Sequence, residues 1–281
     1  MLIDPFFPEW ETDLNRLHAA LPHGADLMLL IDSAFVPKLF RQLNDNSKAI
    51  LLFEFLPVCS KEARDVSPFV VRFDPADKSL ARLLKRCSGW PMLSALATYE
   101  SVEQVAKRLG AWCIVEVDGQ NLNFRFPDTR RLPAIFEKLT PQQRLELTGN
   151  AIDWHYIGRD GSWRSLPLEP NPIPLSIPVK TTLDEHQFGR LLQESEPDEM
   201  WVQLLDRGAR TDLLPSQRHA LLSNALYVAD KHGLDDTLKV AWCLDCIQTS
   251  CQSDAVTLRA RLLGWIQENV GSESENVYQS A

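Results

Sequence analysis

Over residues 1–166, short apolar runs alternate with stretches whose apolar residues recur every three or four positions. The runs predict strands and the stretches predict amphipathic helices. Asp118-Gly119 favours a hairpin, and Arg159-Asp160-Gly161 is expected to join a second hairpin formed by 151–157 and 162–166. This mixture predicts a mixed sheet covered by helices. The other expected strands are 26–31, 49–55, 69–73, 111–117 and 122–126, and the expected helices are 34–44, 78–87, 102–109 and 132–138.

From residue 183 onward the pattern changes to helical periodicity alone. Four segments carry it, and Pro197 is expected to interrupt the first of them because proline cannot continue a helix. Helices of this length predict a compact bundle. The segments are 183–206, 216–231, 237–251 and 254–269.

A proline-rich segment separates the two patterns. Residues 167–182 read PLEPNPIPLSIPVKTT, which is too rich in proline for a helix or a central strand and is expected to be extended. The sequence therefore predicts an α+β protein with two domains. We expect a mixed α/β sheet domain at 1–166, a proline-rich linker at 167–182, an all-α helical bundle domain at 183–270 and a flexible tail at 271–281.

Composition and charge narrow the class of protein. Hydrophobic residues make up 44% and charged residues 24% of the 281 residues, which is typical of a globular domain protein. We expect no targeting or membrane-spanning segment, and hence a chain that stays in the cytoplasm. The net charge is −9: residues 1–166 hold 20 basic and 21 acidic residues, whereas 183–281 hold 8 and 16. That acidic second half disfavours nucleic acid and membranes, and it fits either a basic protein partner or a solubilising surface.

The sequence contains little that resembles an active site. Cys243 and Cys246 form a CxxC pair, but inside a helical segment and without further zinc ligands, so buried thiols are expected. Asp153 and His155 lie two apart on a strand and could pair, as a structural hydrogen bond or, less in keeping with the sequence, in a hydrolase. Phosphate-binding glycine motifs are absent, and we expect no cofactor and no metal. Arg125, Arg130 and Arg131 form a basic group, in which an arginine pair with Asp128 is expected.

An ordered series of landmarks between Asp26 and Trp163 resembles the N-terminal domain of the type VI secretion adaptor family (Tap/Tec, VasW-like). Two departures are Pro127, where an aromatic residue is usual, and Thr129, where proline is usual. The main landmarks are Leu29-Leu30-Ile31-Asp32-Ser33-Ala34, Ser67-Pro68-Phe69-Val70-Val71-Arg72-Phe73, Gly89-Trp90, Phe124-Arg125-Phe126-Pro127-Asp128-Thr129-Arg130, Leu139-Thr140-Pro141, Gly149 and Trp154.

The resemblance implies a cytoplasmic adaptor chaperone without enzymatic activity. Such a protein binds a cognate toxic effector and loads it onto a VgrG or PAAR spike protein, in some cases with a co-chaperone. A scaffold or oligomer subunit is the alternative, and a hydrolase using Asp153 and His155 is a more remote one. The candidate partner-binding residues are Trp201, Trp242 and Trp265 in the helical domain, and Arg125, Asp128 and Arg130 in the first.

Overall fold

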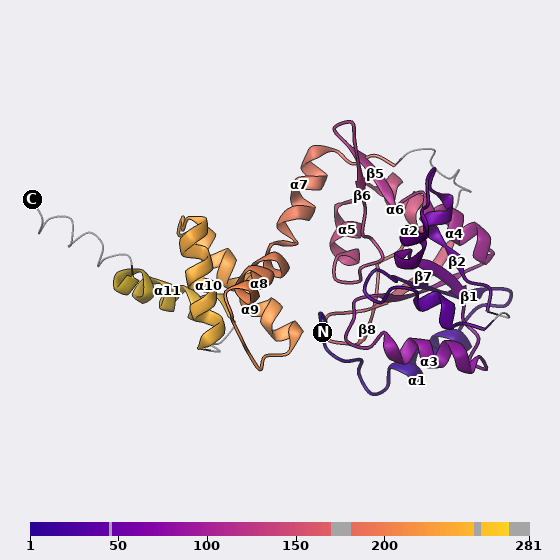
Figure 1. Cartoon of the computed structure of the whole chain (residues 1–281), viewed down its shortest axis with the longest axis horizontal. Helices are drawn as coiled ribbons and strands as arrows, with labels where there is room; N and C mark the ends of the chain where they lie inside the picture. Colours follow the sequence, from indigo (N-terminus) through magenta and orange to yellow (C-terminus); the bar gives the residue numbers. More distant parts are fainter. Residues whose placement is uncertain (45–46, 170–180, 250–253, 270–281) are drawn as a thin grey trace, which may run out of the picture. The chain divides into compact units, whose positions relative to one another are not determined.

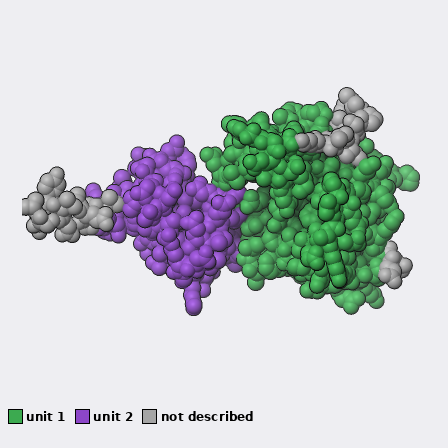
Figure 2. Space-filling model, turned by 45° about the horizontal axis from the view of Figure 1, so that its top comes forward, with its two compact units in different colours: residues 1–193 green, residues 194–281 purple. Residues whose placement is uncertain are grey.

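A computed structural model describes residues 1–44, 47–169, 181–249 and 254–269 (Figure 1). The chain forms two compact units, Met1–Gln193 and Glu194–Ala281 (Figure 2). The first contains a sheet with helices on both faces, and the second is helical, as the α+β prediction required. Within the described residues, no helix is both long and apolar enough to cross a membrane.

The central element of the first unit is a six-stranded sheet with the order β2-β3-β1-β4-β7-β8. Every pairing between these strands is antiparallel, which differs from the mixed sheet expected from the sequence. The predicted bounds of β1 and β7 are confirmed. The strands are β1 (Asp26–Ile31), β2 (Ile50–Leu51), β3 (Phe69–Arg72), β4 (Leu93–Thr98), β7 (Ala151–Ile157) and β8 (Trp163–Ser165).

Both faces of the sheet are buried because the central strands are apolar on both sides. In β1, Met28 and Leu30 join one core, whereas Leu27, Leu29 and Ile31 join the other. The Met28 core is covered by α4 (Val102–Gly110), α5 (Leu132–Lys138) and α6 (Pro141–Thr148), and the Leu29 core by α1 (Trp10–Ala19) and α3 (Lys78–Arg86). Successive side chains of a strand point to opposite faces of the sheet, so Asp32, directly after β1, follows Met28 and Leu30 on the same face. Its neighbours Cys113 and Phe124 belong to the Met28 core.

Two predicted elements are broken by local backbone geometry. The expected strand 49–55 is β2 followed by a 3₁₀ helix, η2 (Leu52–Phe55), because the Phe53 amide donates to Ser67 Oγ at 3.0 Å and leaves the sheet ladder. The expected helix 34–44 contains only η1 (Leu39–Gln42), since Lys38 adopts a left-handed φ of 65° that an α-helix excludes. The short helix α2 (Lys61–Val66) was not predicted.

The Asp118-Gly119 hairpin is confirmed. Val117 pairs with Gln120 across a two-residue turn in which Asp118 and Gly119 have φ values of 46° and 74°. Positive φ at both positions is what a type I′ hairpin turn requires. The hairpin joins β5 (Ile114–Val117) to β6 (Gln120–Asn123) in a separate two-stranded sheet.

The second unit contains four helices among its described residues: α8 (Glu196–Asp206), α9 (Pro215–Lys231), α10 (Asp236–Gln248) and α11 (Ala255–Asn269). Pro197 lies in the first turn of α8, where its missing N–H costs nothing, so it starts a helix and does not kink one. The helices enclose one core that includes Leu204, Leu222 and Trp242.

The helix α7 (Glu185–Gln193), which we assigned to the helical domain at 183–270, groups with the first unit. Gln187 Nε2 donates to the Lys138 carbonyl at 2.9 Å and to Gln143 Oε1 at 2.8 Å, and Phe188 packs on the Met28 core. The units therefore divide between Gln193 and Glu194. Most of the proposed linker 167–182, namely 170–180, and the proposed tail 271–281 lie outside the described residues.

Candidate protein-binding site

Two sequence landmarks far apart in the chain meet where β1 ends. Arg125 Nη2 donates to Asp32 Oδ2 at 2.8 Å, which joins residues 93 positions apart. The other oxygen, Asp32 Oδ1, accepts the Ala34 amide at 3.0 Å, so both carboxylate oxygens have partners. Asp32 is the buried member of this ion pair at 1% side-chain exposure, whereas Arg125 is 39% exposed.

The expected pair between Asp128 and an arginine is made by Arg130. Arg130 Nε and Nη2 donate to Asp128 Oδ1 and Oδ2 at 3.1 and 2.8 Å, a bidentate contact, and the Arg130 amide also donates to Oδ1 at 3.0 Å. Asp128 is buried, and its carbonyl accepts the Leu132 amide at the start of α5. The geometry makes this pair a brace for the turn into α5, while Arg125 is the cation that remains accessible.

At the two positions where the sequence departs from the adaptor pattern, the chain is nevertheless well packed. Thr129 is buried, and its amide donates to the Pro91 carbonyl at 3.0 Å, which ties the turn to the residues just before β4. Pro127 is also buried. These residues hold the turn against the sheet.

An aromatic side chain links the two arginines. The Phe35 ring lies 4.9 Å from Arg125 Cζ and 5.8 Å from Arg130 Cζ, and it stacks on Trp90 at a centroid separation of 6.1 Å. A guanidinium over an aromatic face gains about 0.5–1 kcal/mol at an exposed site. Phe35 thus restricts the rotamers of Arg125 and holds its guanidinium in one orientation.

Beside this ion pair there is a cavity of about 250 Å³. Its polar lining comes from Asp32, Arg125 and the exposed Asn123. The remaining walls are almost entirely apolar, and they include Phe53, Val66, Pro68, Cys113, Phe124 and Pro127. Within the described part of the chain, the site therefore combines a small apolar hollow with an accessible cation, Arg125.

Burial raises the pKa of the Asp32 carboxyl above its ordinary value of 3.8, although the neighbouring Arg125 guanidinium opposes the shift. The folded protein consequently retains the Asp32 proton at a higher pH than the unfolded chain does. Ionisation of Asp32 therefore lowers the free energy of unfolding as the pH rises from 3.8 through the pKa of Asp32 in the folded protein.

We expect Asp32→Asn to remove this pH dependence. In urea unfolding between pH 3.5 and 7, the free energy of unfolding of the wild type minus that of Asp32→Asn should fall as the pH rises. Asp160→Asn is a control of opposite sign, since hydrogen bonds from Ser162 and Arg164 outweigh desolvation and lower the pKa of Asp160. An Asp32 difference that grows with pH would contradict the assignment.

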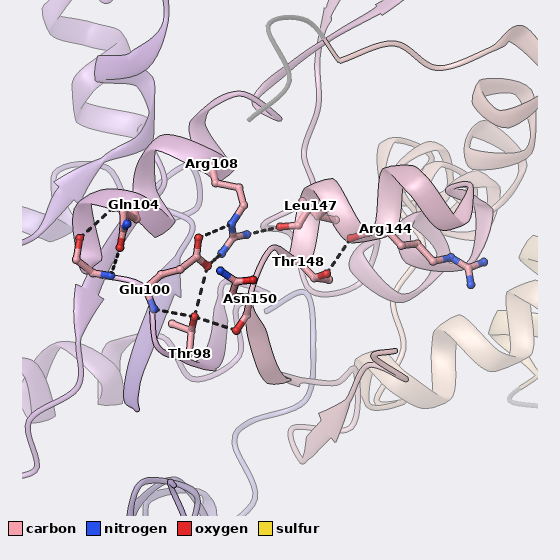
Figure 3. A network of polar contacts seen from close by, with 9 residues as sticks. Thr98, Glu100, Gln104, Arg108, Arg144, Leu147, Thr148 and Asn150 are labelled. Carbon is pink, nitrogen blue, oxygen red and sulfur yellow. Dashed lines mark hydrogen bonds and ion pairs between the residues drawn. The ribbon is translucent and has the colours of Figure 1, made fainter. Parts of the chain in front are cut away.

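A second buried ion pair, which sequence reasoning missed, stabilises the first unit on the same side of the sheet (Figure 3). Arg108, at 5% side-chain exposure, donates from Nε and Nη2 to Glu100 Oε1 and Oε2 at 3.2 and 2.5 Å. It also donates to the Leu147 carbonyl, which joins α4 to the end of α6. The one feature of the sequence that is connected with this ion pair is Gly149, because a side chain at that position would collide with Arg108.

Asp153 and His155 share a face of β7, as expected, with His155 Nε2 2.9 Å from Asp153 Oδ2. Asp153 is 45% exposed, and neither residue lines the cavity beside Arg125. Cys243 and Cys246 are buried, as expected, and burial raises the pKa of the Cys243 thiol to about 12. Across the described ranges, no cluster of three or more His, Cys, Asp or Glu side chains has the geometry to hold a metal ion.

The three candidate tryptophans of the second unit differ in position. Trp242 is fully buried, and its Nε1 donates to the Ala225 carbonyl at 3.1 Å, so a partner cannot reach it in the folded unit. Trp265 is partly buried against Trp242, with ring centroids 5.8 Å apart. Trp201 is partly buried as well, and the Arg218 Cζ lies 4.2 Å from the centroid of its ring.

The comparisons with known proteins give one match. Residues 27–146 match the family described as a domain of unknown function (DUF4123), a segment that runs from β1 into α6. It covers less than half of the chain, and it contains Asp32, Arg125, Asp128 and Arg130. Searches of the curated proteins and of the solved structures gave no match. The Asp32–Arg125 ion pair, which connects residues 93 positions apart, therefore lies entirely within the segment that matches DUF4123.

Proposed function

We propose that this protein is a cytoplasmic adaptor chaperone, which binds a cognate toxic effector and loads it onto a VgrG or PAAR spike protein of a type VI secretion system. The observation that carries the proposal is the DUF4123 match over residues 27–146, because this domain occurs in type VI effector adaptors. The accessible Arg125 within that segment is a group suited to a protein partner, since arginine is enriched at the centres of protein interfaces.

In this proposal the protein catalyses no reaction. Asp153 and His155 pair on a strand without a third group positioned as in a catalytic triad among the described contacts, which favours a structural role. The acidic helical unit selects the cargo, and the first unit performs the docking step that different adaptors share. Exchange of the helical unit between two adaptors tests this division, and an unchanged cargo preference would contradict it.

The test of the adaptor role is capture of the tagged protein from its native cytoplasm under conditions where the secretion system is expressed. We expect recovery of one effector together with a VgrG or PAAR protein, identified by mass spectrometry. Deletion of the adaptor gene should then abolish secretion of that effector and leave other cargo unaffected. Recovery of neither class, with self-association of the tagged protein, would instead support a scaffold.

A further inference from the structure

The cavity beside Arg125 has the chemistry of a binding pocket for one residue. Among the described residues, most of its walls are apolar, and the charged group that remains accessible in it is the Arg125 guanidinium. A cavity of about 150 Å³ holds one benzene ring, so 250 Å³ accommodates a large side chain and a neighbouring polar group, but not a drug-sized ligand.

Arg125 has donors to spare for such a polar group. Only its Nη2 has a hydrogen-bond partner among the described residues, namely Asp32 Oδ2. The remaining N–H groups of the guanidinium fork match a carboxylate, which they can bind through two parallel hydrogen bonds. The stack on Phe35, at 4.9 Å, fixes the fork without using any of these donors.

The buried Asp32 leaves the guanidinium as the accessible member of the ion pair. Both Asp32 oxygens have partners, and its side chain is only 1% exposed, so an incoming group contacts Arg125 and not the aspartate. The Asp32 carboxylate accepts a hydrogen bond from Arg125 and so fixes the orientation of the guanidinium, as a buried carboxylate orients a metal-binding histidine. The accessible side of the pair is therefore cationic.

We propose that this cavity binds a short segment of the partner protein in which a large apolar side chain lies next to a carboxylate. The apolar side chain enters the hollow among Phe53, Val66 and Phe124, and the carboxylate binds the free donors of Arg125. This inference rests on the proposed function, because it takes the partner to be a protein, and it adds the chemical class of the recognised segment.

Short peptides test the proposal on the purified full-length protein. The probe is acetyl-Ser-Gly-Phe-Asp-Gly-Ser-amide, compared with one peptide in which Asn replaces the Asp and another in which Ala replaces the Phe. In ¹⁵N-edited NMR spectra we expect a saturable shift of the Arg125 Nε–Hε resonance and of the Phe124 amide. Each altered peptide should bind at least tenfold more weakly, since each lacks one of the two recognised groups.

Variants locate the binding. Arg125→Gln should abolish it, while Arg86→Gln, at an exposed arginine of α3, should leave it unchanged. Ala34→Phe and Val66→Trp each fill part of the cavity and should block the peptide, whereas Ala76→Phe, at an exposed alanine outside it, should not. The amide spectrum of each variant verifies its fold.

Equal binding of the three peptides, or no binding by any of them, would overturn the proposal, and neither result depends on whether a variant folds. These experiments contain no effector or secretion component. If the tagged protein captures an effector but the peptides fail, the adaptor role stands and the cavity assignment falls. If the peptides bind but no effector is captured, the pocket stands without the adaptor role.

Discussion

Gly149→Ala is expected to destabilise the first unit by about 3 kcal/mol or more. Gly149 has φ 57° and ψ −126°, a conformation open to glycine but not to residues with a Cβ. A Cβ at this position would lie 2.3 Å from Arg108 Nε, so the buried arginine would have to leave its place. Displacing one partner of a buried ion pair costs roughly 3–5 kcal/mol.

The measurement is thermal unfolding followed by circular dichroism, where this loss should lower the midpoint of the first unit by about 6–12 °C. Variants at two other glycines distinguish the backbone strain at Gly149 from the clash with Arg108. Gly24→Ala also introduces a Cβ at a positive φ, 84°, but that Cβ meets nothing within 4 Å. Gly189→Ala, in the helix α7, has neither problem and should be neutral or slightly stabilising.

A double-mutant cycle decides whether the clash with Arg108 is the reason. In an Arg108→Ala background the atoms that the new Cβ would meet are gone, so Gly149→Ala should cost only its backbone strain, about 1–3 kcal/mol. If Gly149→Ala costs the same in both backgrounds, contact with Arg108 does not explain the glycine.

The parts of the fold that were predictable depend on neighbours in sequence. The Asp118-Gly119 turn sets its own backbone conformation, and the apolar run 26–31 and the strand-like stretch 151–157 are long enough to fix their strands. Where the outcome depends on distant residues, prediction failed. The run 49–55 leaves the sheet because Ser67 captures the Phe53 amide, and α7 joins the first unit because Gln187 finds partners near α5 and α6.

The candidate site shows the same limit. The sequence identified Arg125, Arg130 and Arg131 as one basic group with Asp128 as the expected partner of an arginine, but it could not say which arginine pairs with Asp128. In the structure, Arg125 pairs with Asp32, which lies 93 residues away in the sequence, and Arg130 pairs with Asp128. Burial also separated the three tryptophans, which have the same apolar helical context in the sequence and different accessibility in the structure.

That difference among the tryptophans leads to the second large expected effect. Trp242→Ala should destabilise the helical unit by roughly 3–5 kcal/mol, because it leaves a cavity in the core. It also removes the hydrogen bond to the Ala225 carbonyl and the contacts of the ring with Trp265 and Arg261. A loss of this size is a large part of the roughly 5–15 kcal/mol of a typical domain.

Hydrogen exchange measured by mass spectrometry on the full chain reports each unit separately. For Trp242→Ala we expect faster deuterium uptake in peptides from α9 and α10, and unchanged uptake in β1 and β4. Trp201→Ala is the matched control, since Trp201 is only partly buried against the core and also contacts Arg218, so its removal should cost less than that of the fully buried Trp242. Uptake that rises equally in both variants would contradict the burial assignment.

These two variants also determine which tryptophan can bind a partner. Under the proposed adaptor role, a loss of effector binding in Trp242→Ala would follow from a disrupted core and would not place Trp242 at an interface. Trp201→Ala removes a partly exposed ring that packs at the edge of the core, so lost binding in this variant, with unchanged exchange in α9 and α10, would place Trp201 at the interface. Retained binding would move the interface to another surface, because Trp242 cannot be reached while the unit is folded.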